Sequence, residues 1–340
     1  MPGMSQPRQR GGSVTLLAVP AVSYCLYGRR VLSEVPLPIP VLPDDESATN
    51  DWIIRREDAA PPTISPVHRL VAEHLDADGS AIDRFYRSGS EGWLWDRQAG
   101  TCRLEPGAGR VTVYPVSDAD EDDLGLLLIG PVASFMLHQS GYPNLHASAV
   151  VTPHGACAFM GPSTFGKSTL AAGLLRAGGH LVTDDILPLD FRRDGVYGVP
   201  GPPMMKVWSN TAQQTFGITA DLPRLSSLTD KRLLELRRHH YSFVERAAYL
   251  RAIYVPQRYD PTRAARTDVR IQPLTPREAA LALLSQTFRG HYLMPDELAM
   301  LLTQYTQLVK QARVSLIHLP HGLEYQDAVT ERIVADLAAL

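Results

Sequence analysis

The stretch GPSTFGKST, residues 161–169, fits the phosphate-binding pattern G-x-x-x-x-G-K-[ST]. An apolar run, GACAFMG at residues 155–161, precedes it, and STLAAGLLRAG at residues 168–178, which has helical apolar spacing, follows it. A glycine loop between a strand and a helix points backbone amides and the helix dipole at an anion. We therefore interpret the loop as a nucleotide site, and a chance glycine-rich turn is the alternative.

The residue types of the loop predict how it holds phosphate. Gly161 and Gly166 permit backbone torsions that residues with a Cβ resist. Lys167 is expected to reach the β- and γ-phosphates, and Ser168 to place its hydroxyl on Mg²⁺. Thr164 stands where many such loops have glycine, so we expect local backbone strain there. The expected cofactor-binding residues are Gly161, Ser163, Thr164, Phe165, Gly166, Lys167, Ser168 and Thr169.

Three acidic or basic side chains flank the loop in sequence. Asp184 and Asp185 end the strand-like run HLVTDD, at the edge where open α/β sheets place ligands. One carboxylate is expected to help hold Mg²⁺ and the other to accept a proton from an attacking hydroxyl; a metal pair without a base is the alternative. His146, in NLHASAVV, lies beside another strand-like run, and a structural histidine is its alternative interpretation.

Residues 13–123 are predicted to form a smaller β-rich N-terminal domain after a flexible tail at residues 1–12. Its strand-like runs are VTLLAV, SYCLYG, DWIIRR, GWLWD and RVTVYPV. Acidic residues at 117–123 precede an apolar run at 124–139, a pattern typical of a helix N-terminus rather than of a metal site. Aromatic residues at 85–86 and 93–95 belong either to the core or to a substrate-recognition surface.

Residues 124–340 are predicted to form an α/β catalytic domain around the phosphate-binding loop. Strand, loop, helix and strand follow one another within this region, which favours a largely parallel sheet flanked by helices. A further strand is expected at LRAIYVP, and helices are expected at residues 276–287, 294–311 and 326–340.

Composition limits the location and the partners. With 340 residues, 44% apolar and 20% charged, the chain is long enough for two domains with ordinary cores. With a formal charge of −3, the chain has no net positive charge that would attract nucleic acid or an anionic membrane, so neither partner is expected. Cys25, Cys102 and Cys157 lack metal or disulfide spacing, which fits a reducing cytoplasm. The short apolar run near the N-terminus is interrupted by Pro20, so a signal peptide is the less favoured alternative.

The block at residues 145–189 resembles the catalytic core of the HPr kinase/phosphorylase family. That family has a His-containing strand, a phosphate-binding loop, a helix ending in Gly and a strand ending in Asp-Asp, at similar intervals. The resemblance implies that Asp184 is the catalytic base with His146 as its helper, while Lys167 acts on the phosphates. It also implies that Asp185, with Ser168, lies on the metal side, and that ATP and Mg²⁺ are the cofactors.

The segment GVPGPPMMKVW, residues 198–208, departs from the family pattern. It lacks the metal-binding Glu and the Gly-rich segment linked to phosphorolysis, which puts a phosphorylase activity in doubt. It looks more like stand-alone HPr-kinase-like proteins, among them lasso-peptide kinases that phosphorylate a serine hydroxyl of a peptide precursor. This resemblance implies that Lys206, before Val-Trp208, contacts substrate or phosphate, with Lys231 as a second cation. A solvated lysine beside a core tryptophan is the alternative for Lys206 and the favoured interpretation of Lys231.

These observations favour an ATP-dependent kinase that acts on a serine hydroxyl of a peptide or small protein. A small-molecule kinase would carry the same loop and Asp pair, and an ATP-binding regulator without phosphoryl transfer is the third alternative. The family forms hexamers, but the C-terminal residues match too loosely to transfer an oligomeric state, so a homo-oligomer remains an open alternative.

Overall fold

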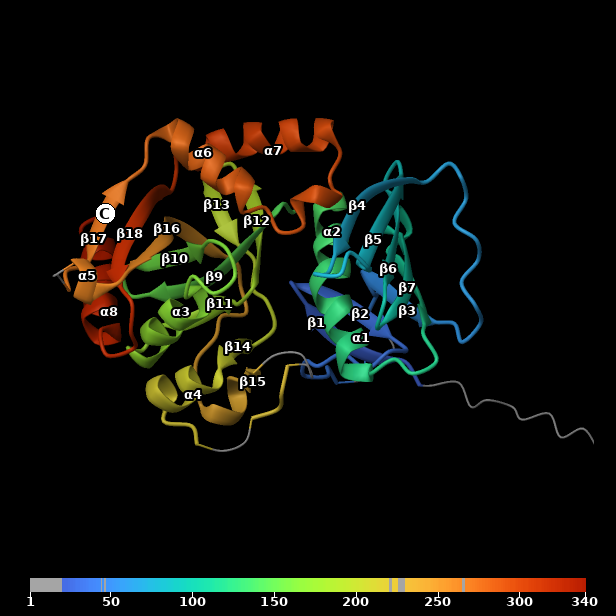
Figure 1. The fold of residues 1–340 in the computed structure, drawn as a ribbon, viewed down its shortest axis with the longest axis horizontal. Coiled ribbons are helices and arrows are strands. Elements are labelled where there is room, and N and C mark those ends of the chain that lie inside the picture. The colour runs from blue at the N-terminus through green and yellow to red at the C-terminus, as the bar shows by residue number, and fades with distance from the viewer. Residues whose placement is uncertain (1–19, 44, 46, 220–221, 226–229, 265–266) are drawn as a thin grey trace, which may run out of the picture.

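The computed structural model describes residues 20–43, 45, 47–219, 222–225, 230–264 and 267–340. The expected tail at residues 1–12 and the expected strand at residues 14–19 lie outside these residues. The fold is α/β, as the sequence predicts, with two large sheets side by side and helices packed against each (Figure 1). In the described part of the chain, no helix is both long and apolar enough to cross a membrane.

The first sheet is 8-stranded and antiparallel over most of its width. It contains β1 (Val22–Leu26), β2 (Arg29–Ser33), β3 (Trp52–Arg56), β4 (Arg69–Leu75), β5 (Ala81–Ser88), β6 (Glu91–Asp96), β7 (Gly100–Glu105) and β8 (Arg110–Pro115). Its order is β1-β2-β3-β8-β7-β6-β5-β4. The expected strands at β1, β3, β6 and β8 are confirmed, whereas the other four were not predicted. Of the aromatic residues at 85–86 and 93–95, Phe85 and Trp93 are buried, which confirms them as core residues, whereas Tyr86 and Trp95 are half-buried.

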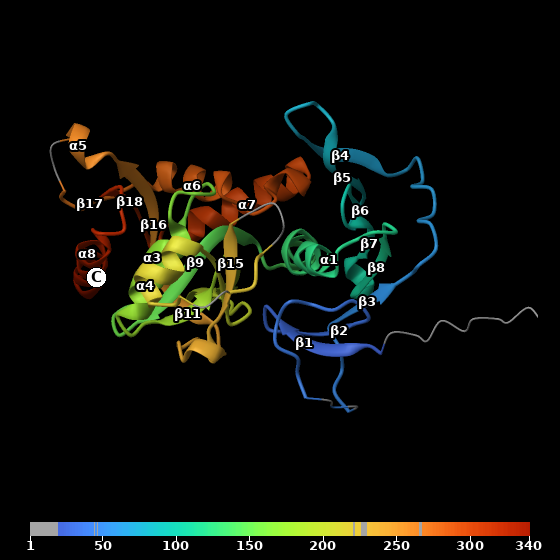
Figure 2. The ribbon, with the colours of Figure 1, turned by 60° about the horizontal axis from the view of Figure 1, so that its bottom comes forward.

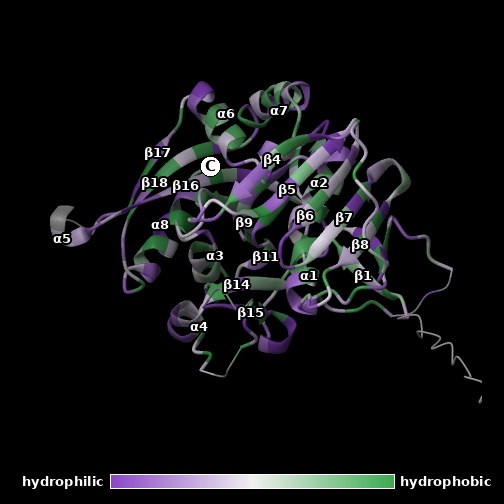
Figure 3. Ribbon diagram, turned by 45° about the vertical axis from the view of Figure 1, so that its right-hand side comes forward, coloured by the Kyte–Doolittle hydropathy of each residue, from purple (hydrophilic) through white to green (hydrophobic). Residues whose placement is uncertain are grey.

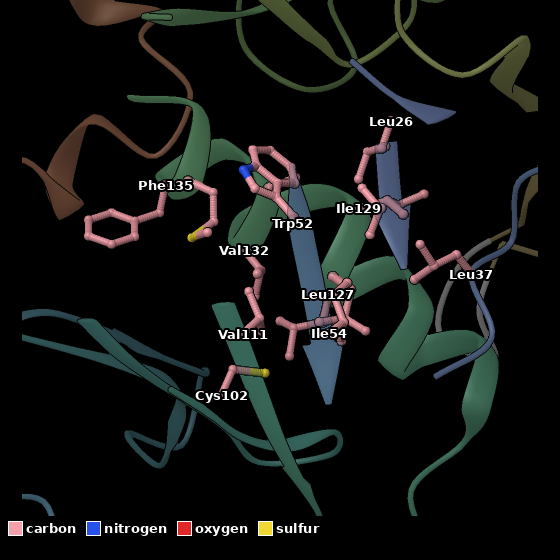
Figure 4. Packing of buried hydrophobic residues seen from close by; sticks show 14 of the residues in the cluster. Leu26, Leu37, Trp52, Ile54, Cys102, Val111, Leu127, Ile129, Val132 and Phe135 are labelled. Atoms are coloured by element: carbon pink, nitrogen blue, oxygen red, sulfur yellow. The ribbon is translucent and has the colours of Figure 1, made fainter. Parts of the chain in front are cut away.

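A broken helix packs against this sheet. It comprises α1 (Glu121–Leu127), a π-helical turn (Leu128–Val132) and α2 (Ala133–Gln139). Asp120 caps α1 by accepting from two backbone amides, so the acidic run is a helix N-terminus, as expected. Pro131 lacks an amide hydrogen, and the widened turn accommodates it without ending the helix. Figure 4 shows Ile129 and Val132 of this helix close to Trp52 and Ile54 of the sheet, in one apolar core.

The second sheet is also 8-stranded. It contains β9 (Asn144–Thr152), β10 (Gly155–Met160), β11 (His180–Thr183), β12 (Ile186–Arg192), β13 (Gly195–Gly198), β16 (Ala248–Tyr259), β17 (Arg270–Pro273) and β18 (Arg313–Pro320). The order is β10-β9-β12-β13-β16-β18-β17, with β11 paired to β9 and β10 also paired to β16.

The expectation of a largely parallel sheet is wrong. Among the described strands, parallel pairing within this sheet is limited to β10 with β16 and β16 with β18. The physical reason lies in the connections: β9 and β10 are joined by a turn of Pro153 and His154, and so short a connection permits only an antiparallel pair. The same holds for β12 and β13.

Helices cover both faces of the second sheet. The helices of this half are α3 (Lys167–Arg176), α4 (Ser209–Phe216), α5 (Pro261–Ala264), α6 (Pro276–Ser285), α7 (Pro295–Leu308) and α8 (Gln326–Ala338). Alternation along β10 sends Phe159 into the core beneath α3 and α8, and Ala158 into the core beneath α6 and α7. The helices expected in this half are confirmed as α3, α6, α7 and α8. Figure 3 shows hydrophobic (green) and hydrophilic (purple) residues interleaved along α6 and α7.

A two-stranded ribbon lies between the two halves (Figure 2). It consists of β14 (Met204–Trp208) and β15 (Lys231–Glu235), paired antiparallel. Met205 and Val207 face the core beneath α3, whereas Met204 on the opposite face joins the core of the first sheet. One face of the ribbon therefore packs beneath α3, and Met204 and Leu233 on the other face contact the core of the first sheet.

Candidate active site

Strand direction brings the predicted site residues to one edge of the second sheet. β9 lies between β10 and β11 and runs antiparallel to both, so the ends of those two strands meet the beginning of β9. The register pairs Met160 with Ala147, Thr183 with Ala149, and Ile186 with His146. As a result the glycine loop, the Asp pair and His146 converge.

The glycine loop encloses the Lys167 ammonium group. Its Nζ donates to the carbonyl oxygens of Gly161 and Pro162, over 2.8 and 3.0 Å. Burial lowers the pKa of Lys167 to about 8, although the two aspartates oppose the shift. Thr164 has a φ of 72°, so the expected backbone strain is present.

Gly166 is required where the loop enters α3. Its φ is 87°, in the left-handed region that favours glycine. A Cβ at this position would lie 2.1 Å from Nη2 of Arg258, at the end region of β16. Arg258 thus stands directly against the loop, and burial lowers the pKa of its guanidinium.

Asp184 is almost fully buried and is surrounded by hydrogen-bond donors. Its Oδ1 accepts from the Ser168 hydroxyl over 2.8 Å and also from the Ser148 hydroxyl. Its Oδ2 accepts from the backbone amide of Lys206 over 2.8 Å. The first aspartate is therefore joined to the hydroxyl that the sequence pattern assigns to Mg²⁺.

Asp185 has different partners. Its Oδ1 lies 3.2 Å from Nε2 of His146, and its Oδ2 accepts from Nζ of Lys206 over 2.7 Å. Burial raises the pKa of Asp185, but the positive charge of Lys206 and the contact with His146 outweigh burial and hold that pKa well below its usual range. The ring of Phe288 meets His146 edge-on, with centroids 5.5 Å apart.

The expected pairing of His146 with Asp184 is therefore not found. Thr183 pairs with Ala149, which places the following Asp184 beside Ser148. Ile186 pairs with His146, which places Asp185 beside that ring. A φ of 80° at Asp185 marks the turn between these two positions.

The ribbon contributes cations to the site. Lys206 is not on a solvated face, because its side chain is 20% exposed and bound to Asp185. Nζ of Lys231 lies 5.5 Å from the ring centroid of Trp208, and both residues line the same cavity as Lys167. Both cations that the resemblance suggested therefore line the site, although a solvated face was the favoured interpretation of Lys231.

The phosphate end of the site is narrow, and a wide cavity adjoins it. The narrow cavity has a volume of about 30 Å³, whereas its neighbour has about 680 Å³, within the range of small-molecule pockets. Trp208 and Thr211 line both cavities, and Arg258 and His321 line the wide one. The wide cavity is thus the part with room for a nucleoside.

The donor set fits Mg²⁺ bound together with phosphate. Ser168 and Asp184 supply hard oxygen atoms 2.8 Å apart, and Mg²⁺ is commonly held by one or two carboxylates plus substrate phosphates. Across the described residues, no cluster of three or more His, Cys, Asp or Glu side chains is placed to hold a metal ion by protein ligands alone. Asp185 is engaged by Lys206 and His146.

Two residues of the site were missed by the sequence analysis. Ser148 could have been predicted as a site residue. It follows His146 by two positions in the same strand, and side chains two positions apart lie on the same face. Arg258 carries no comparable signal, because it is distant in sequence and reaches the loop through the pairing of β16 with β10.

No protein-family model matches the sequence, and no curated protein matches it. Among solved structures, the chain is similar to the HPr(Ser) kinase/phosphatase from Coxiella burnetii. The match covers 57% of this chain and 98% of that chain, with 14% sequence identity and a TM-score of 0.28. Because this TM-score is too low to relate two folds, the function proposed below rests on the geometry of the site.

Proposed function

We propose that the protein is an ATP-dependent kinase that transfers the γ-phosphoryl group to a serine hydroxyl of a peptide or small protein. The observation that carries the proposal is the separation of the two carboxylates: Asp184 is bound to the Ser168 hydroxyl, and Asp185 is bound to His146. A nucleotide-binding regulator requires the first contact only. The second places a carboxylate and an imidazole beside the phosphate end of the site.

Nucleotide binding is assigned to the loop and the wide cavity. Backbone amides at the start of α3 hold the phosphates, and Lys167 leaves the carbonyls of Gly161 and Pro162 to neutralise them. Ser168 and Asp184 would hold Mg²⁺, which neutralises phosphate charge when bound. Arg258, against Gly166, is a further cation within reach of the phosphates.

Proton transfer is assigned to Asp185 with His146 as its positioning residue. The serine O–H bond breaks as its oxygen bonds to phosphorus, the proton moves to the Asp185 carboxylate, and ADP leaves with the electron pair of the broken P–O bond. Lys206 lowers the pKa of Asp185, so moving Lys206 onto the transferring phosphoryl group makes this carboxylate a stronger base. This proposal exchanges the two aspartate roles that the family resemblance implies.

The test is phosphoryl transfer to a peptide library with serine at internal and C-terminal positions, incubated with ATP and Mg²⁺ and followed by mass spectrometry. An Asp184→Ala variant is the control. One added phosphoryl group that is absent from the control supports the kinase. Intact ATP binding without transfer to any peptide contradicts it, and would favour a small-molecule acceptor or a regulator.

A further inference from the structure

One face of the β14–β15 ribbon runs from the candidate phosphate site to a second cavity. Met204, Lys206 and Trp208 alternate with core residues along β14, so they share this face. Leu233 is paired directly with Lys206 and lies on the same face. Lys206 and Trp208 line the phosphate site, whereas Met204 and Leu233 line the second cavity.

The second cavity is an apolar groove of about 640 Å³ between the ribbon and residues 37–41 of the first half. Leu37 and Ile39 are buried in the wall, and Val41 at the mouth is 63% exposed. At the rim, Nε of Arg238 lies 2.6 Å from the Glu235 carboxylate, and this pairing compensates the negative charge there. The groove therefore suits apolar side chains.

Geometry relates the groove to the reacting hydroxyl. A strand rises about 3.3 Å per residue, so Met204 lies about 7 Å from Lys206 along β14. An extended peptide has nearly the same rise. If its serine lies at Asp185 and its chain follows the ribbon face, side chains about two to four residues away reach the groove. A small metabolite held at Asp185 would not extend that far.

We propose that this groove binds apolar side chains of the acceptor peptide, about two to four residues to one side of the phosphorylated serine. The inference rests on the proposed kinase function and assigns its specificity to residues 37–41 and the ribbon. The two halves of the protein then act together, because the first supplies one wall and the second supplies the floor and the phosphate site.

The experiment uses eleven-residue peptides, a length chosen so that about five positions flank a single serine on each side. All other positions are alanine or glutamine, and one leucine or one aspartate is moved through them. For the wild-type protein, leucine at one of the proposed positions should lower KM about tenfold, because a leucine side chain leaves water. Aspartate at that position should raise KM.

Val41→Asp should remove the leucine preference and Leu233→Ala should weaken it. Both should leave KM for the peptide without leucine within about twofold, because Leu233→Ala adds no charge beside its strand partner Lys206. Val67→Asp is the matched control, because Val67 is 66% exposed and does not line the groove. ATP affinity and the thermal transition of each variant establish that it is folded. Val41 is exposed, so its substitution leaves the core intact even if Leu233→Ala does not fold.

Each outcome separates the two proposals. If the wild-type protein phosphorylates serine peptides with no positional leucine preference, or if Val41→Asp keeps that preference, the groove assignment is wrong and the kinase stands. If no peptide is phosphorylated, both fail. If the protein is a dimer that Val41→Asp dissociates, the groove holds a second copy of the chain and the peptide assignment is overturned.

Discussion

The Ser168 hydroxyl donates to the Asp184 carboxylate over 2.8 Å, at the edge of the second sheet where β10 and β11 end. This contact ties the first aspartate to the phosphate-binding loop, and leaves the second to His146 and Lys206. Two neighbouring carboxylates therefore have distinct surroundings. Distinct surroundings permit distinct chemical roles.

The first prediction concerns Mg²⁺. Asp184→Asn should abolish most of the increase in ATP affinity that Mg²⁺ produces, because it removes the negative charge of the one carboxylate assigned to the ion. Asp185→Asn should keep that increase within about threefold, because its carboxylate binds Lys206 and His146 instead. Calorimetric titration with ATP, with and without Mg²⁺, measures both. The reverse pattern would restore the roles implied by the family resemblance.

The second prediction concerns pH. Burial lowers the pKa of Lys167 to about 8, so the free protein loses this charge as pH rises through about 8. ATP affinity should be highest below that pH and should fall above it, approaching about tenfold per pH unit in the limit. Titrations between about pH 7 and pH 9.5 test this. Lys167→Arg is the control, because an arginine stays charged and should flatten the profile.

A third prediction separates backbone strain from steric conflict. Gly166 and Gly178 both have a positive φ, of 87° and 91°, but an added Cβ meets Arg258 at the first and open space at the second. Gly178→Ala should cost about 1–2 kcal/mol of unfolding free energy. Gly166→Ala should cost a similar amount, because the added Cβ meets only the far end of the flexible Arg258 side chain, which can shift. It should nevertheless weaken ATP binding at least tenfold, because Arg258 is displaced from the loop, whereas Gly178→Ala should leave ATP binding unchanged. Equal ATP affinities of the two variants, measured by titration beside denaturant unfolding, would argue against this role for Arg258.

The fourth prediction concerns acid stability. Arg87 of β5 is buried and binds Glu297 of α7 through two hydrogen bonds, of 2.5 and 3.0 Å, which join the two halves. Burial raises the pKa of Glu297, but the bonds from Arg87 and Gln139 outweigh it and lower the pKa to about 2. The stability contributed by this group is thus full above its ordinary pKa of 4.5 and lost as pH falls toward about 2.

Glu297→Gln should therefore lower stability at neutral pH by roughly 2–3 kcal/mol and flatten the loss between pH 4.5 and about 2. Asp296→Asn is the matched control, because Asp296 is exposed in the same first turn of α7. Thermal unfolding across this pH range measures both variants. If Glu297→Gln loses stability between pH 4.5 and about 2 as steeply as the wild-type protein, the acid sensitivity does not come from Glu297.

The sequence predicted the elements around the loop better than their arrangement. The glycine pattern located α3, and apolar runs located β9, β10 and β11, because these signals depend on neighbouring residues. The antiparallel pairing depends on how short each connection is. Which aspartate meets His146 depends on the register of β9 with β11 and β12, and single-residue register is not encoded in apolar runs.

Residues that reach the site from distant segments were harder to predict. Lys206 was suggested by a resemblance, but its contact with Asp185 requires the ribbon to fold back over the loop. Arg258 arrives through a parallel strand pair between segments far apart in the chain. Such long-range contacts leave no local pattern in a single sequence.

Following the γ-phosphoryl group in a single turnover shows whether Asp185 is the base of a serine kinase. ATP labelled at its γ-phosphorus, Mg²⁺ and a serine peptide that the protein accepts are mixed with excess protein, and the label is tracked in time. We expect the label to move from ATP to the serine, and Asp185→Asn to slow this step at least about a hundredfold with ATP affinity nearly unchanged. Near-normal transfer by Asp185→Asn, or label that never reaches the peptide, would contradict this expectation.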